Sequence, residues 1–165
     1  MFSINCLEIT ASKNQWEENK SLYKNLLSDK DYDDFEKDNA NHEPFRKRFF
    51  FNDFYEKKQH GDLKPNTNRA LPENFFGNNI NVQAIVGKNG SGKSSLMDLM
   101  YMAINNFSYM FERGNKEKRP GAAEMYFVSG LYAKLYFCFQ TNLYELDCSD
   151  NNICLKKKGE VQPIF

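Results

Sequence analysis

The stretch VGKNGSGKSS, at residues 86–95, constrains the fold of this 165-residue chain more than any other part of the sequence. Its residues 87–94 match the pattern GxxxxGK[ST] at every fixed position. The apolar segment INVQAIVG, at 80–87, precedes the loop and reads as a buried strand, and a helical pattern follows it. A glycine loop between a strand and a helix is typical of a phosphate-binding site, so we expect the chain to bind a nucleotide.

The helical pattern after the loop runs from Ser94 to about Phe107. Its apolar residues repeat at the spacing that places side chains on one face of a helix. These residues are Leu96, Leu99, Met100, Ala103, Ile104 and Phe107. We therefore expect an amphipathic helix whose N-terminus points at the loop.

The spacing of the loop follows from the shape of a triphosphate. Glycines let backbone N–H groups approach the phosphates closely, and the first turn of the helix adds further amides and the positive end of its dipole. We expect Lys93 to contact the β- and γ-phosphates and to be the catalytic residue, and Ser94 to be a ligand of Mg²⁺. The full set of expected phosphate-binding residues is Gly87, Lys88, Asn89, Gly90, Ser91, Gly92, Lys93, Ser94 and Ser95.

The composition narrows the class of protein. Hydrophobic residues make up 41% of the chain, enough for one domain with a core. The 22 basic and 22 acidic residues balance, so no net positive charge attracts nucleic acid. The N-terminus lacks the pattern of a signal peptide, no apolar run is long enough to span a membrane, and the four cysteines form no metal-binding pair. We expect a cytoplasmic protein without a zinc site.

The rest of the chain divides into three parts. Residues 2–10 alternate as a strand does, with Phe2, Ile4 and Cys6 expected on one face. Residues 11–79 form a polar insertion, which begins with a capping box of Ser12 and Gln15 and a helix to about Leu27. Residues 124–158 read as an antiparallel β-meander with two tight turns.

The segment FRKRFFFNDFYEKK, at 45–58, has two interpretations. Basic residues interleaved with aromatic ones can bind a nucleic-acid strand by charge and stacking. We favour the alternative of an ordinary strand, in which Phe49 and Phe51 face the core while Arg46, Lys47 and Arg48 face water.

The run IVGKNGSGKSSLMDLM resembles the NGSGKS loop of ABC-type ATPases, specifically the RecF, SMC and double-strand-break-repair class. The long insertion before the loop is similar to the ATPases of bacterial anti-phage systems associated with Septu and retron operons. The resemblance implies an α/β fold, in which residues 1–165 form the N-terminal lobe of a P-loop NTPase head with an antiparallel meander.

The resemblance also implies a mechanism. ATP and Mg²⁺ would bind the loop, and two heads would dimerise on ATP to gate a DNA-directed or anti-phage activity. The implied partners are a second head in a homodimer or larger assembly, an effector nuclease or toxin, and nucleic acid.

Two motifs of these ATPases lack convincing matches. The first motif is an apolar strand that ends in Asp-Glu, but here Glu145 and Asp147 alternate with apolar residues. The second is a Ser-Gly-Gly signature, but the segment 128–131, VSGL, has one glycine. We interpret both as ordinary structure. Because positioning and charge supply catalysis in phosphoryl transfer, we expect this segment alone to bind ATP and hydrolyse it poorly.

Two other functions stay open. A nucleotide sensor without turnover could dock a nuclease or toxin partner. A small-molecule kinase could use the same loop, with Arg113 and Arg119 in a lid. The predicted meander argues against a kinase, because kinases continue with βα units and a parallel sheet.

Overall fold

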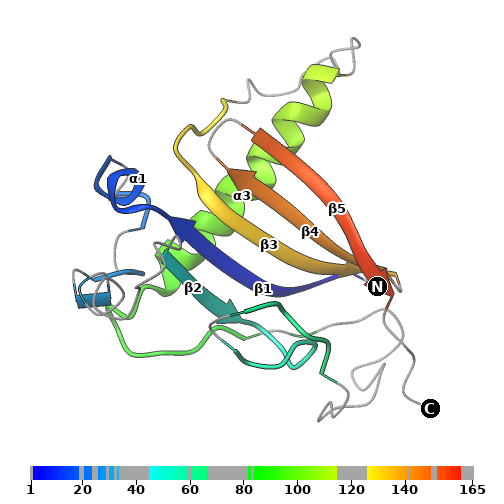
Figure 1. Cartoon of the computed structure of the whole chain (residues 1–165), viewed down its shortest axis with the longest axis horizontal. Coiled ribbons are helices and arrows are strands. Elements are labelled where there is room, and N and C mark those ends of the chain that lie inside the picture. Colours follow the sequence, from blue (N-terminus) through cyan, green and yellow to red (C-terminus); the bar gives the residue numbers. More distant parts are fainter. Residues whose placement is uncertain are drawn as a thin grey trace.

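Strand β1 (Phe2–Ala11) lies inside a five-stranded antiparallel sheet with the order β2-β1-β3-β4-β5, shown in the computed structural model in Figure 1. The other strands are β2 (Phe45–Phe50), β3 (Tyr132–Phe139), β4 (Asn142–Ser149) and β5 (Asn152–Glu160). The helices whose bounds the structure describes are α1 (Lys13–Glu18) and α3 (Lys93–Gly114). The structure describes residues 2–18, 21–23, 26–28, 30, 31, 33, 45–58, 61–66, 82, 84–114, 126–140, 142–149 and 152–160.

The C-terminal strands form the meander that the sequence predicts. Strands β3, β4 and β5 pair in succession and antiparallel. The meander begins later than expected, because residues 126–131 lead into β3 without strand structure. Gly130 turns the chain there with a φ of 74°, a conformation that glycine adopts without strain.

The faces of β1 differ from the simple alternation of its sequence. The register against β3 shifts between Ile4 and Cys6, so Asn5 is an extra residue in a β-bulge. Beyond the bulge, Leu7 and Ile9 join the core under α3, while Cys6 packs on the opposite face. The expectation that Phe2, Ile4 and Cys6 share a face was therefore wrong.

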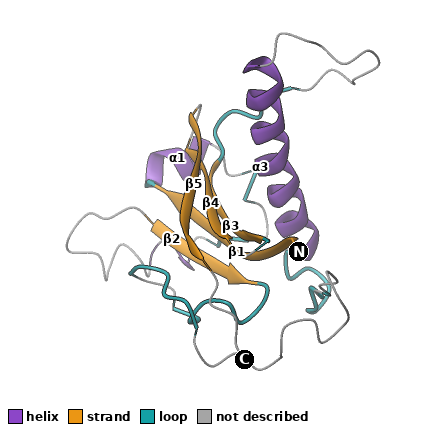
Figure 2. Ribbon diagram, turned by 90° about the vertical axis from the view of Figure 1, so that its right-hand side faces the viewer, coloured by secondary structure: helices purple, strands orange, loops and turns teal. Residues whose placement is uncertain are grey.

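The main core lies between the sheet and α3, which forms a separate layer on one face of the sheet (Figure 2). Four residues of the predicted helical face are buried, namely Leu96, Leu99, Met100 and Ala103. Phe107 is half-buried, and Ile104, expected on the same face, is 38% exposed because it lies at the edge of the contact with the sheet. The helix is longer than predicted and ends at Gly114 instead of about Phe107. No glycine or proline interrupts residues 94–113, so nothing local stops the helix earlier.

The capping box at the start of α1 is confirmed. The backbone N–H of Ser12 donates to Gln15 Oε1 at 2.8 Å, and Gln15 N–H donates to Ser12 Oγ at 3.4 Å. The helix ends at Glu18 and does not continue to Leu27 as expected. The buried Tyr23 lies in a turn instead, where its hydroxyl accepts from Tyr132 N–H at 2.9 Å and donates to Gly130 O at 3.3 Å.

The face of the sheet opposite α3 carries a buried ion pair. Arg48 on β2 lies directly opposite Glu8 on β1, and Arg48 Nε donates to Glu8 Oε2 at 2.5 Å. Both side chains are 2% exposed. Phe49 and Phe51 pack against the core as predicted, but Arg48 does not face water, because Glu8 draws it against the sheet.

The expected strand at 80–87 is not formed over Val82 and residues 84–87. Val82 is 57% exposed and Val86 is 87% exposed, whereas Ile85 packs against the core. A strand exists only where a neighbour completes its hydrogen bonds, and none of the described strands pairs with this segment. The apolar composition alone was therefore not sufficient to make a strand.

Candidate phosphate-binding loop

The glycine loop is a tight turn that leads directly into α3. Ser91 N–H donates to Lys88 O at 3.2 Å, and Leu96 N–H donates to Gly92 O at 2.9 Å as the first hydrogen bond of the helix. Gly90 and Gly92 have φ values of 78° and 83°. Residues with a side chain rarely adopt this conformation, so the turn requires glycine at both positions.

Lys93 ties the end of the loop back to its beginning. Its ammonium donates to Gly87 O at 2.6 Å and to Lys88 O at 2.8 Å. An ammonium group has three donors, so these two bonds leave a third for an anion. The same contacts hold the positive charge of Lys93 over the loop.

Gly87 lies so close to the Ser91 side chain that a larger residue at 87 would require the Ser91 hydroxyl to move. A Cβ built on Gly87 would be 2.6 Å from Ser91 Oγ, closer than real Cβ atoms approach other atoms. The close approach accounts for the first glycine of the pattern. It also shows that the loop closes on itself across Gly87 and Ser91.

A cavity of about 330 Å³ opens at the loop and the start of α3. Its lining residues are Asn89, Gly90, Gly92, Lys93, Ser94 and Ser95. None of the six is acidic, and the first turn of α3 carries no acidic residue. The amides of a helix's first turn have no partner within the helix and lie at the positive end of its dipole. The cavity therefore suits an anion with several oxygen atoms.

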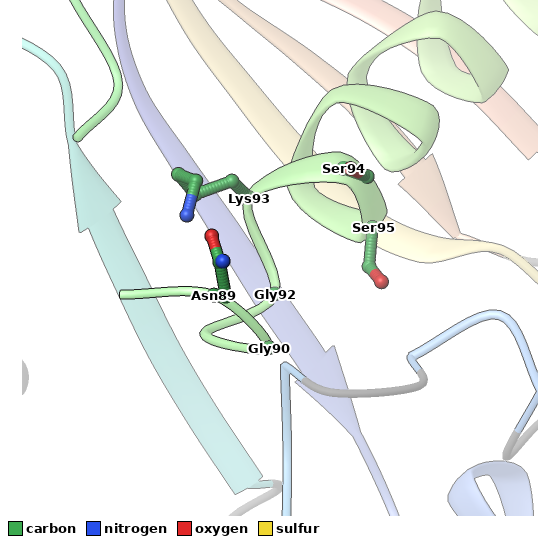
Figure 3. A pocket seen from close by; sticks show the side chains of 6 residues that line it. All are labelled: Asn89, Gly90, Gly92, Lys93, Ser94 and Ser95. Carbon is green, nitrogen blue, oxygen red and sulfur yellow. The ribbon is translucent and has the colours of Figure 1, made fainter. Parts of the chain in front are cut away.

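The two serines of the helix start are not gathered with the lysine. Figure 3 shows the side chains of Lys93 and Asn89 directed toward each other, while Ser94 and Ser95 project from the other side of the first turn. Ser94 is exposed and Ser95 is half-buried. Ser94 therefore lines the same cavity as Lys93, but its hydroxyl would have to rotate to meet a phosphate beside the ammonium.

The residues that line the cavity fit the expected group, a triphosphate with Mg²⁺. The donor set consists of backbone N–H groups, one ammonium, one carboxamide and two hydroxyls, all of which bind phosphate oxygens. Mg²⁺ in such sites keeps several waters and takes few protein ligands, so one serine hydroxyl is enough. Among the described residues, no group of three or more His, Cys, Asp and Glu could hold a metal by itself.

Glu145 and Asp147 lie on β4, fifty or more residues after the loop, on the face of the sheet opposite α3. The carboxylate of Glu145 is surrounded by Lys134, Lys156 and Lys158, at 4.0, 3.9 and 3.3 Å. Lys134 also lies 3.3 Å from Asp147. These contacts agree with the interpretation of both acids as ordinary structure.

The segment VSGL at 128–131 also has a structural explanation. The buried Asn106 on α3 donates to Val128 O at 2.7 Å and accepts from Val128 N–H at 2.8 Å, which fixes the segment beside the helix. The sequence patterns did not indicate the hydrogen bonds of Asn106 and Tyr23 or the pairing of Glu8 with Arg48. Each depends on a partner far along the chain that no local pattern reveals.

The comparisons with known proteins give no relative of this chain. No family model, no curated protein and no solved structure matches it. Within the described residues, no helix has the length and apolar character needed to cross a bilayer.

Proposed function

We propose that this chain binds the phosphate tail of ATP, with Mg²⁺, at the loop 87–95. The observation that carries the proposal is the link from Lys93 to Gly87 O and Lys88 O, which holds a positive charge over a glycine turn at the N-terminus of a 22-residue helix. Backbone amides and a lysine at a helix N-terminus are the groups that bind di- and triphosphates in proteins.

Each residue of the loop would have a separate role. Glycines 87, 90 and 92 allow the turn and keep side chains out of the way of phosphate oxygens. Lys93 would neutralise charge on the terminal phosphates, and the amides of residues 93–95 would hold the phosphate nearer the helix. Ser94 would hold Mg²⁺ after a rotation of its side chain toward the phosphates.

We further propose that the chain is the nucleotide-binding lobe of an ABC-type ATPase, whose heads dimerise on ATP and gate a DNA-directed or anti-phage activity. The support is the order of elements: an N-terminal strand, an insertion, the NGSGKS loop, its helix and an antiparallel meander. The meander after α3 also favours this class over a kinase, whose fold continues with parallel βα units. A nucleotide sensor without turnover is the second candidate. Hydrolysis needs an acidic pair at the nucleotide, but Glu145 and Asp147 on β4 are paired with lysines.

The proposed site is tested by titrating the chain with fluorescently labelled ATP, with and without Mg²⁺. We expect saturable binding that unlabelled ATP competes away and that Mg²⁺ strengthens. Ser94→Ala should abolish the strengthening by Mg²⁺, and the neighbouring Ser95→Ala should keep it. Binding that ignores Mg²⁺ in the unaltered chain would remove Ser94 from the site, and the absence of saturable binding would refute the proposal.

A further inference from the structure

The face of the sheet opposite α3 carries charges whose sign alternates from strand to strand. Arg48 on β2 lies opposite Glu8 on β1, and Glu8 lies opposite Lys134 on β3. Lys134 lies 4.0 Å from Glu145 on β4, which lies opposite Lys156 on β5. We call these five side chains the charge ladder. Opposite charges on neighbouring strands attract, so the ladder favours this order of strands.

The end of the charge ladder on β2 is covered by the chain itself. Arg48 donates to Lys58 O at 2.9 Å and to Gly61 O at 2.5 Å. The neighbouring Arg46 also donates to Gly61 O, at 3.3 Å. The loop that follows β2 therefore supplies the acceptors beyond the last strand at this end.

The end of the ladder on β5 has a surplus of positive charge. Lys156 and Lys158 both lie near Glu145, at 3.9 and 3.3 Å, and Lys134 lies near Glu145 and Asp147. Three ammonium groups thus share two carboxylates. Lys156 is 52% and Lys158 49% exposed, whereas Lys134 is 27% exposed, so the surplus lies at the outer strand.

Strand β5 is also an edge of the sheet (Figure 1). In the described part of the chain it pairs with β4 alone, in regular register from Asn152 to Lys157. An edge strand presents backbone N–H and C=O groups that another strand can pair with. Leu155 is 44% exposed although its partner on β4, Leu146, lies in the main core. An apolar side chain beside Leu155 would therefore extend that core.

We propose that the outer edge of β5 binds an extended acidic peptide of a partner protein, which adds to the sheet as a sixth strand. Its acidic side chains lie beside Lys156 and Lys158 and continue the alternation of the charge ladder. Its intervening apolar side chains lie on the other face, beside Leu155. Main-chain hydrogen bonds supply affinity in this mode of recognition, and alternate side chains supply specificity.

The charge of β5 selects this occupant over a second copy of the chain. Pairing of β5 with another β5 would bring the lysines of both strands together, and lysines on an edge strand normally prevent such pairing. An acidic strand instead receives the surplus positive charge.

This site is separate from the proposed nucleotide site. None of the residues that line the cavity at the glycine loop lies on β5. We expect the peptide to bind equally well with and without ATP, so failure of either proposal leaves the other standing.

Fluorescence anisotropy with the whole chain tests the contact. The probe is a fluorescein-labelled peptide of about nine residues, the length of β5, in which glutamate alternates with valine. We expect saturable binding that weakens about tenfold when Lys156→Gln and Lys158→Gln are combined, from the loss of two exposed ion pairs. Lys57→Gln with Lys64→Gln is the matched control, since it removes the same charge from exposed positions outside β5 and should bind as the unaltered chain does.

Amide hydrogen exchange tests whether the peptide adds as a strand. We expect exchange over residues 152–157 to slow about tenfold at saturation, because new main-chain hydrogen bonds protect the edge. Binding without slower exchange would mean attraction by charge alone and would overturn the proposal. So would the absence of saturable binding, equal weakening by both pairs of substitutions, or tighter binding of oligothymidine at the same lysines.

Discussion

The ammonium of Lys93 donates a hydrogen bond to the carbonyl oxygen of Gly87, six residues earlier, at 2.6 Å. This bond joins the first residue of the GxxxxGK[ST] pattern to its lysine. The shape of the loop therefore depends on both ends at once, and a change at either end should alter how the loop presents its amides to an anion.

Gly87→Ala should weaken ATP binding without unfolding the chain. The new Cβ would lie 2.6 Å from Ser91 Oγ, so either the Ser91 hydroxyl rotates or the turn opens to relieve the contact, and both change the polar groups that the loop presents. Because Gly87 is exposed, the core under α3 is not affected. We expect affinity for labelled ATP to fall about tenfold or more, the cost of about 1.4 kcal/mol of lost contact, while thermal unfolding changes little.

Ser91→Gly in the same variant is the matched rescue. It removes the atom that the new methyl group meets, so the double variant should recover most of the lost affinity. If Gly87→Ala binds ATP as well as the unaltered chain, the close approach of Gly87 and Ser91 has no role in binding.

Glu8→Leu should destabilise the fold strongly. It leaves the buried guanidinium of Arg48 without its carboxylate, a change that costs about 3 kcal/mol or more. Chemical denaturation measures this loss. The double variant Glu8→Leu with Arg48→Met should be more stable than Glu8→Leu alone, because it removes the uncompensated charge as well.

The exposed pair of Glu56 and Lys58 provides the control for this prediction. Its atoms are 2.6 Å apart, but both side chains are in contact with solvent. Glu56→Gln should change the unfolding midpoint far less than Glu8→Leu. Equal effects of the two substitutions would mean that burial of the Glu8 pair contributes nothing to stability.

The stability of the fold should fall on the alkaline side. Burial, together with the nearby charge of Glu8, raises the pKa of Cys6 from 9.0 to about 12, and burial with the charge of Asp147 raises the pKa of Cys148 likewise. Below pH 9 both thiols are protonated in the folded and the unfolded chain. Between pH 9 and 12 the unfolded chain releases these protons first, so unfolding becomes progressively easier.

Denaturation midpoints measured from pH 8 to pH 11 test this dependence. Cys148→Ala should make the alkaline decline shallower, whereas Cys154→Ser, which replaces an exposed thiol, should leave it unchanged. A decline of the same slope in all three proteins would assign it to other groups.

Local patterns predicted the elements that depend on local chemistry. The Ser12 and Gln15 capping box, the apolar face of α3 and the hairpins of the meander all follow from residues close in sequence. The errors came from distant partners. Tyr23 lies in a turn, held by Gly130 and Tyr132 more than a hundred residues away, where periodicity alone predicts a helix.

The same limit applied to the candidate site. The glycine spacing predicted the turn and the position of Lys93, because each residue there is fixed by its neighbours in the chain. The strand expected at 80–87 needs a neighbouring strand to exist, and its sequence contains no information about that neighbour. Likewise the orientation of the Ser94 side chain is a rotamer choice that the pattern does not specify.

The most direct test compares ATP binding by Lys93→Ala and Lys88→Ala, measured by titration calorimetry with Mg²⁺ present. Both variants remove one positive charge from the loop, but Lys93 is the one that bonds the carbonyls of Gly87 and Lys88 and lines the cavity. We predict that Lys93→Ala abolishes measurable binding and keeps the fold by circular dichroism, while Lys88→Ala binds with nearly unaltered affinity. Unchanged affinity in Lys93→Ala would contradict the assignment of the loop as a phosphate-binding site.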